Sequence, residues 1–121
     1  MLTLPSSVRV YVATAPMDMR KSFDGLAAAV TSVFGRDPAS GHLHVFWNKR
    51  GHLVRILFFD RTGYCVLSKR LARGRFRFVA QAARGEPCIE MDGMELSLIL
   101  EGIDLSEAKR RKRWRPPKKA A

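Results

Sequence analysis

The sequence predicts an α+β fold: a mainly antiparallel β-meander sheet of about five strands packed with two helices, followed by a disordered basic C-terminal tail. Three observations predict it. Residues 42–79 contain four short apolar segments separated by glycine-containing turns, segments with helical periodicity lie on either side of them, and charge falls into blocks. The length of 121 residues suits one domain with a buried core, so we expect a single domain at 1–105 and a flexible basic tail at 106–121.

The meander is predicted from side chains that alternate with a period of two. Residues 53–59 are apolar on both sides except at Arg55, which indicates an interior strand. Arginine and phenylalanine alternate over residues 75–79, which predicts a half-buried strand with a basic outer face. Each predicted turn supplies a glycine where a tight turn needs positive φ: Gly51, Gly63 and Gly74.

The elements outside the meander begin with a predicted half-buried strand at residues 8–13, where apolar and other side chains alternate. From Asp18 to Phe34, apolar residues recur every three or four positions. This spacing predicts a helix of about four turns, with Asp18 as N-cap and Gly35 just after its end.

A second helix is predicted to start at Asp92, because Glu95 three residues later completes a capping box. Met91 and Leu96 are placed to form a hydrophobic staple across this start. We expect the helix to end at Gly102, and its buried stripe to consist of Leu96, Ile99, Leu100 and Ile103.

Charge is strongly segregated in this basic chain, whose net charge is +11. Residues 49–85 contain ten basic residues and one acidic residue. Residues 86–107 contain seven acidic residues and no basic residue, and residues 108–121 contain eight basic residues and no acidic residue. The acidic block could neutralise the basic sheet within the monomer, or the cations could meet a polyanion. The tail has no acidic residue after Glu107, so we expect it to stay disordered until a polyanion binds.

A nucleic acid is the polyanion that these residues favour, with arginine and lysine contacting phosphates and the tail wrapping the duplex or entering a groove. Aromatic residues interleave with the cations, although an alternating strand more often buries such rings. The predicted nucleic-acid-binding residues are Arg50, Arg55, Lys69, Arg70, Arg73, Arg75, Arg77, Lys109, Arg110, Arg111, Lys112, Arg113, Trp114 and Arg115.

The sequence offers little that would support catalysis, and we expect no catalytic residue, no cofactor and no metal site. There is no phosphate-binding loop or dinucleotide fingerprint. His42, His44 and His52 could share a metal, but acidic or thiol ligands are lacking nearby except Asp60, and strand-edge histidines commonly face solvent.

A metal-dependent nuclease would need several carboxylates to hold its ions. The candidates are Asp18, Asp24, Asp60, Asp92 and Glu95. All of them except Asp24 are expected to act as helix caps or turn residues, so the sequence does not favour a nuclease.

The compartment is predicted from the cysteines and the apolar runs. Cys65 and Cys88 have no metal-site or redox-motif spacing and are expected to be reduced, packed thiols. The sequence has neither a leader-like N-terminus nor an apolar run long enough to span a membrane. We therefore expect a cytoplasmic protein.

Several short motifs, taken together, resemble a known family. They are residues 17–26 (MDMRKSFDGL), 40–46 (SGHLHVF), 49–51 (KRG), 60–63 (DRTG), 68–76 (SKRLARGRF) and 100–104 (LEGID). As a set, they resemble the small accessory protein, TnpB or Orf2, of bacterial insertion sequences of the IS66 type. The resemblance runs from about Pro5 to Asp104 and does not extend to the tail.

The resemblance implies a non-catalytic accessory factor for DNA transposition. In that family, strand transfer is attributed to a separate, larger transposase with an acidic triad, so no catalytic residues carry over to this chain. Two hypotheses remain open. The protein could bind the DNA of the element ends, or it could be an adaptor whose acidic helix or exposed sheet edge docks on the transposase or on another copy of itself.

Overall fold

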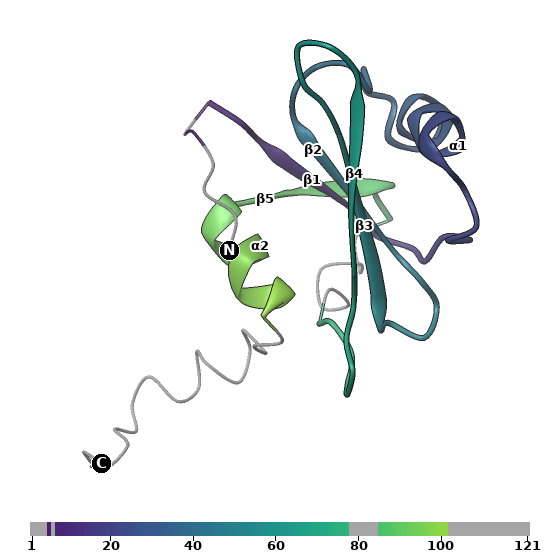
Figure 1. Ribbon diagram of the computed structural model, residues 1–121, viewed down its shortest axis with the longest axis vertical. Coiled ribbons are helices and arrows are strands. Elements are labelled where there is room, and N and C mark those ends of the chain that lie inside the picture. The colour runs from purple at the N-terminus through teal and green to yellow at the C-terminus, as the bar shows by residue number, and fades with distance from the viewer. Residues whose placement is uncertain (1–4, 6, 78–84, 102–121) are drawn as a thin grey trace.

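The computed structural model describes residues 5, 7–77 and 85–101, and it has the predicted α+β fold (Figure 1). A five-stranded sheet is combined with two α-helices, the first of which continues into a π-helical turn, η1. The elements in chain order are β1 (Val10–Ala13), α1 (Phe23–Ala29), η1 (Val30–Phe34), β2 (Leu43–Trp47), β3 (Leu53–Phe59), β4 (Tyr64–Arg70), β5 (Cys88–Met91) and α2 (Gly93–Leu100).

The sheet is mixed, with strand order β4-β3-β2-β1-β5. β1 and β2 are parallel because α1 and η1 form the crossover between them, and the other three pairings are antiparallel. β3 is an interior strand, as predicted. The prediction of a half-buried first strand was wrong, because β1 lies between β2 and β5 and all four of its residues are buried.

The first helix begins later than predicted. Asp18 is not its N-cap: its carboxylate accepts hydrogen bonds from the backbone N–H and the guanidinium of Arg20. These local bonds form a turn, so α1 starts only at Phe23. The predicted end is confirmed, since Gly35 terminates η1 with φ of 67°. Within η1, Phe34 stacks on Phe46 of β2 with ring centroids 5.0 Å apart.

The fourth strand of the predicted meander is not formed in the described residues 75–77. This segment is irregular, although Phe76 is buried as an alternating strand would bury it. The fifth strand is instead β5, which the sequence did not predict and which pairs with β1. The prediction at residues 78–79 lies outside the described residues.

The second helix starts as predicted. The Asp92 carboxylate accepts from the Met94 N–H at 3.1 Å, and the Glu95 side chain completes the capping box. Leu96, Ile99 and Leu100 are buried. α2 is described as far as Leu100, and the predicted positions of Gly102 and Ile103 lie outside the described residues.

The helices cover opposite faces of the sheet (Figure 1). α1 and η1 cover the face that carries His44, Phe46 and Leu57, and α2 lies on the face that carries Val45 and Ile56. Each face of the sheet is therefore covered in part by a helix. No helix in the described part of the chain combines the length and apolar character that crossing a membrane requires.

Candidate nucleic-acid interface

One end of the sheet is built from two chain segments that bond to each other. The β2–β3 turn receives a hydrogen bond from Leu71 N–H to the His52 carbonyl (2.8 Å) and another from Phe76 N–H to the Gly51 carbonyl (2.7 Å). Phe76 is 3% exposed, so its side chain anchors the segment after β4 to the core. We call this the basic end and define it by Lys49, Arg50, Arg70, Arg73, Arg75 and Arg77.

Gly51 allows the two segments of the basic end to approach this closely. Its φ is +76°, and a Cβ atom there would lie 3.2 Å from the Cβ of Arg75. The predicted need for positive φ is also confirmed at Gly74. It was wrong for Gly63, because in that turn the Asp60 carboxylate accepts from the N–H groups of Thr62 and Gly63 and fixes the conformation.

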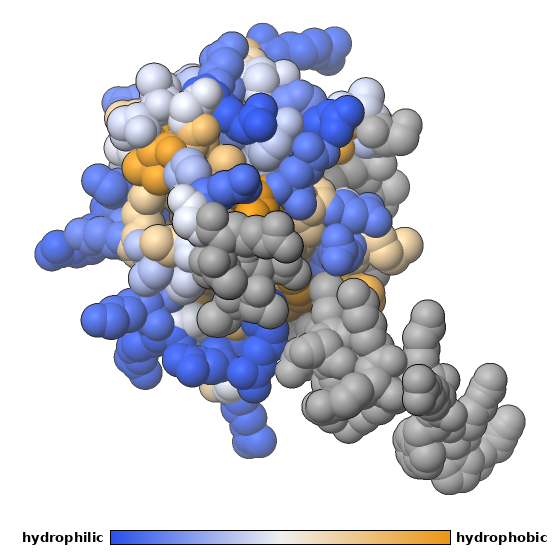
Figure 2. All heavy atoms as spheres, turned by 180° about the vertical axis from the view of Figure 1, so that it is seen from behind, coloured by the Kyte–Doolittle hydropathy of each residue, from blue (hydrophilic) through white to orange (hydrophobic). Residues whose placement is uncertain are grey.

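Several cations of the basic end have no opposite charge in contact with them. Among the described residues, the ion pairs are Arg9–Glu90 at 2.6 Å and Arg20–Asp18 at 2.9 Å, and neither belongs to the basic end. Asp92 and Glu95 are engaged in the cap of α2. In the described part of the chain, the acidic block therefore does not pair with Lys49, Arg50, Arg70 or Arg73. Figure 2 shows strongly hydrophilic side chains at the lower end of the molecule, which in Figure 1 carries the β2–β3 turn and the segment after β4.

The predicted binding residues separate into three groups, of which the first lies at the basic end. Arg50, Arg70 and Arg73 are exposed there. Arg75 is also exposed, but its guanidinium donates to the Arg50 carbonyl at 3.3 Å. Arg77 is exposed at the same end. Lys49 lies beside Arg50 in the same turn and was missed, although its place in the predicted turn would have suggested it.

The second group consists of Arg55 and Lys69, whose side chains donate hydrogen bonds to backbone carbonyls elsewhere in the fold. Arg55 lies on the α1 face of β3, where its Nη1 donates to the Lys21 carbonyl at 3.0 Å. The Nζ of Lys69 donates to the Leu100 carbonyl at 2.6 Å and so contributes a cation at the C-terminus of α2. The third group, the predicted sites at residues 109–115 with Trp114 included, lies outside the described residues.

The aromatic residues considered for base stacking are mostly in the core. Trp47 and Phe76 are buried. Phe59 and Tyr64 are half-buried and contact each other edge to face at the end of the sheet opposite the basic end. Phe78 lies outside the described residues. None of the described rings considered for stacking is exposed at the basic end, which suits phosphate contacts better than base stacking.

The three histidines each have a separate environment. The Nδ1 of His42 accepts from the Arg9 N–H, and the Nδ1 of His52 is 3.0 Å from the Asn48 amide nitrogen. His44 is fully buried against Tyr11 and Phe34, so the expectation that it faces solvent was wrong. Within the described residues, no group of three or more histidine, cysteine or acidic side chains is arranged to hold a metal ion.

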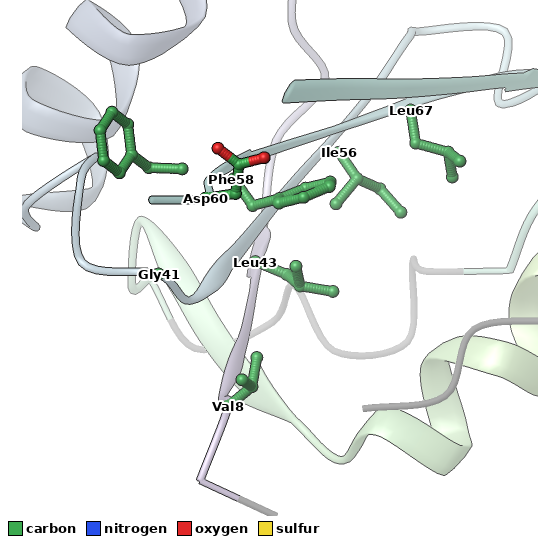
Figure 3. A pocket seen from close by; sticks show the side chains of 8 residues that line it. Val8, Gly41, Leu43, Ile56, Phe58, Asp60 and Leu67 are labelled. Atoms are coloured by element: carbon green, nitrogen blue, oxygen red, sulfur yellow. The ribbon is translucent and has the colours of Figure 1, made fainter. Parts of the chain in front are cut away.

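An apolar groove of about 260 Å³ lies on the α2 face of the sheet, at the end away from the basic end (Figure 3). Leu43, Ile56, Phe58 and Leu67 line it, and Asp60 stands at its rim. Hydrogen bonds from the N–H groups of the following turn hold the pKa of Asp60 below its usual value. These bonds give the carboxylate a structural role in the turn.

Comparison with known proteins identifies one family. Residues 8–110 match the model of a family described as IS66 Orf2-like protein. Two similar proteins come from Sinorhizobium fredii NGR234. The chain is 39% identical to the uncharacterized protein y4hO over 118 residues, which is 98% of each chain. It is 34% identical to the uncharacterized protein y4jC over 113 residues, covering 93% of this chain and 94% of the relative. No solved structure matches the chain.

Proposed function

The chain belongs to the family of IS66 Orf2-like proteins, which have an accessory role in transposition, and from this premise we propose that it is a non-catalytic DNA-binding factor. The basic end and the basic tail contact the phosphates of duplex DNA at the element ends. The larger transposase of the element performs the strand transfer, and this protein assists it.

The observation that carries the proposal is the set of exposed cations on two chain segments that hydrogen-bond to each other. Lys49, Arg50, Arg70 and Arg73 have no carboxylate within ion-pairing distance among the described residues. The hydrogen bonds between the turn and the segment after β4 fix their backbones. Cations fixed in this way release phosphate counterions without first breaking an internal ion pair.

The tail can extend this surface because of where α2 ends. The bond from Lys69 places Leu100 beside the last residues of β4, next to Arg70. The chain between positions 101 and 109 can span at most roughly 27 Å when extended. The basic residues that follow are therefore within reach of a duplex bound at the basic end.

The proposal is tested by measuring duplex affinity, by fluorescence anisotropy, as a function of salt concentration. If about six phosphates are neutralised, the slope of log K against log salt is about −5. The triple variant Arg50→Ala, Arg70→Ala and Arg73→Ala should reduce the slope by about 3. Deletion of residues 108–121 should flatten it as well.

The matched control is the triple variant Arg9→Ala, Arg36→Ala and Arg61→Ala, which removes the same charge from exposed positions at the opposite end of the sheet. Equal losses in the two triple variants would show that net charge, and not the basic end, determines binding. Affinity that does not change with salt would overturn the proposal.

Assistance to the transposase is tested by co-purification of the two proteins after nuclease treatment. A complex that survives the treatment would indicate direct docking, as in the adaptor hypothesis. A complex that disappears would indicate that DNA connects the two proteins.

A further inference from the structure

The outer side of β4 is the longer of the two sheet edges. β4 has seven residues, each paired with one residue of β3, whereas β5 at the other edge has four. Within the described residues, no strand pairs with β4 on its outer side. Edge strands are usually protected by charges, proline or bulges, but Tyr64–Ser68 contains none of these.

The backbone groups that β4 leaves free can be identified from the ends of its ladder with β3. At one end Leu71 N–H donates to the His52 carbonyl, and at the other Asp60 N–H donates to the Gly63 carbonyl. Hydrogen-bonded and non-hydrogen-bonded pairs alternate between these points. The N–H and C=O groups that point away from β3 are therefore those of Tyr64, Val66, Ser68 and Arg70.

We propose that two copies of the chain form a two-fold symmetric dimer in which their β4 strands pair antiparallel, centred on Leu67. In this register Tyr64 lies opposite the partner's Arg70, and Val66 lies opposite the partner's Ser68. Each outward-facing residue of one strand then meets an outward-facing residue of the other. The two sheets become one continuous sheet, and the isologous contact closes as a dimer.

Charge along β4 favours this orientation. Lys69 and Arg70 stand at one end of the strand, and the Asp60 carboxylate stands at the other, 3.6 Å from the sulfur of Cys65. Antiparallel pairing places Lys69 opposite the partner's Cys65, near the partner's Asp60, and separates it from the partner's Lys69. Parallel pairing would bring like charges together, which destabilises a sheet.

The side chains at the centre of the pairing also fit. Leu67 is 40% exposed and lies at the rim of the apolar groove (Figure 3), and in the dimer it contacts the partner's Leu67. On the other face, Arg70 lies opposite the ring of the partner's Tyr64, an arrangement that allows a cation–π contact. Because the strands run antiparallel, the basic ends of the two copies point away from each other.

The first test is the mass of the full chain in solution by sedimentation equilibrium in the absence of DNA. We expect a dimer for the natural sequence and a monomer for Ser68→Pro, since proline at this exposed position removes an outward-facing N–H and leaves the ladder with β3 in place. Ser68→Ala is the matched control and should remain dimeric, with far-UV circular dichroism checking the fold of both. A natural chain that is monomeric, or a folded Ser68→Pro variant that is equally dimeric, would overturn the proposal.

The second test fixes the register by disulfide trapping in a Cys65→Ser, Cys88→Ser background. Residue 67 faces its own copy at a non-hydrogen-bonded position, where Cβ atoms lie about 4.5–5.5 Å apart. Leu67→Cys should therefore form an intermolecular disulfide much faster than Ser68→Cys, whose opposite residue is the partner's Val66. Equal rates for the two variants would rule out the proposed register.

Discussion

Histidine and arginine side chains lie in two contrasting regions of the molecule, the sheet face beneath α1 and the basic end. Beneath α1, His44 is fully buried and Arg55 reaches the Lys21 carbonyl. At the basic end, Arg50 and Arg73 are exposed and have no carboxylate partner among the described residues. The same kinds of residue thus stabilise the fold in one region and remain accessible to a ligand in the other.

The contrast follows from the cost of burying a charge. A buried group must be neutral or hydrogen-bonded, so beneath α1 the ring of His44 is held neutral and Arg55 is tied to the backbone. An exposed cation stays hydrated and can exchange water and counterions for phosphate. Substitutions beneath α1 should therefore change stability, and substitutions at the basic end should change binding.

The largest expected effect on stability is the pH dependence due to His44. Burial lowers the pKa of its imidazole from 6.5 to about 4. Between these values the unfolded chain binds a proton that the native state does not, so stability is complete above pH 6.5 and falls as the pH drops towards 4. The loss is at most roughly 3 kcal/mol, measured by urea unfolding at a series of pH values.

The control for this prediction is His44→Leu, which has a similar volume and cannot titrate. Its free energy of unfolding should be nearly constant between pH 6.5 and 4.5. If the variant lost stability over this range as the natural chain does, another group would be responsible for the pH dependence.

The next effect concerns Arg55, whose side chain packs beneath the start of α1. Arg55→Ala removes the hydrogen bond to the Lys21 carbonyl and the packing of the aliphatic stem, so it should cost about 1–2 kcal/mol of unfolding free energy. Arg50→Ala should leave stability unchanged, because the group of Arg50 that accepts from Arg75 is its backbone carbonyl. DNA affinity should fall in Arg50→Ala and change little in Arg55→Ala. A large loss of affinity in Arg55→Ala with unchanged stability would contradict the contrast between the two regions.

The sequence predicted those parts of the fold that depend on local patterns. The capping box at Asp92 and the helix end at Gly35 are set by residues close to each other in the chain. β5 was missed because its four residues are stabilised by pairing with β1, which lies at the other end of the described chain. The start of α1 was misplaced because Asp18 bonds to Arg20 instead of capping the helix.

The candidate site was predictable as a set of cations but not as a surface. Alternation along the strand predicts that Arg55 lies on the opposite sheet face from Val54 and Ile56. It does not show that α1 covers that face. Lys69 sits at the end of an edge strand like Arg70, yet it meets the end of α2 because that helix crosses the opposite face. Which cations make contacts within the fold depends on how the two helices pack, and the order of the residues does not specify this.

An effect of similar size is expected from alanine in one of the two hairpin turns, which lie at opposite ends of the sheet. Gly51→Ala should cost about 1–2 kcal/mol, because its φ of +76° is unfavourable for a side chain and the new Cβ would lie 3.2 Å from that of Arg75. It should also weaken DNA binding by displacing the segment after β4. Gly63→Ala is the control, since Gly63 has ordinary φ and no atom within 4 Å of an added Cβ. Thermal unfolding that shows equal losses for the two variants would contradict this account of the basic end.

The smallest expected effect on stability is that of Arg73→Ala. Arg73 is exposed and makes no ion pair with a described residue, so the free energy of unfolding should change by less than about 0.5 kcal/mol. If its guanidinium contacts one phosphate, the slope of log K against log salt should become less steep by about 0.9. Arg61→Ala removes the same charge at the opposite end of the sheet and should leave the slope nearly unchanged. Identical slopes for the two variants would mean that DNA binding depends only on the net charge of the protein. The distinction between the two ends of the sheet would then apply to folding but not to binding.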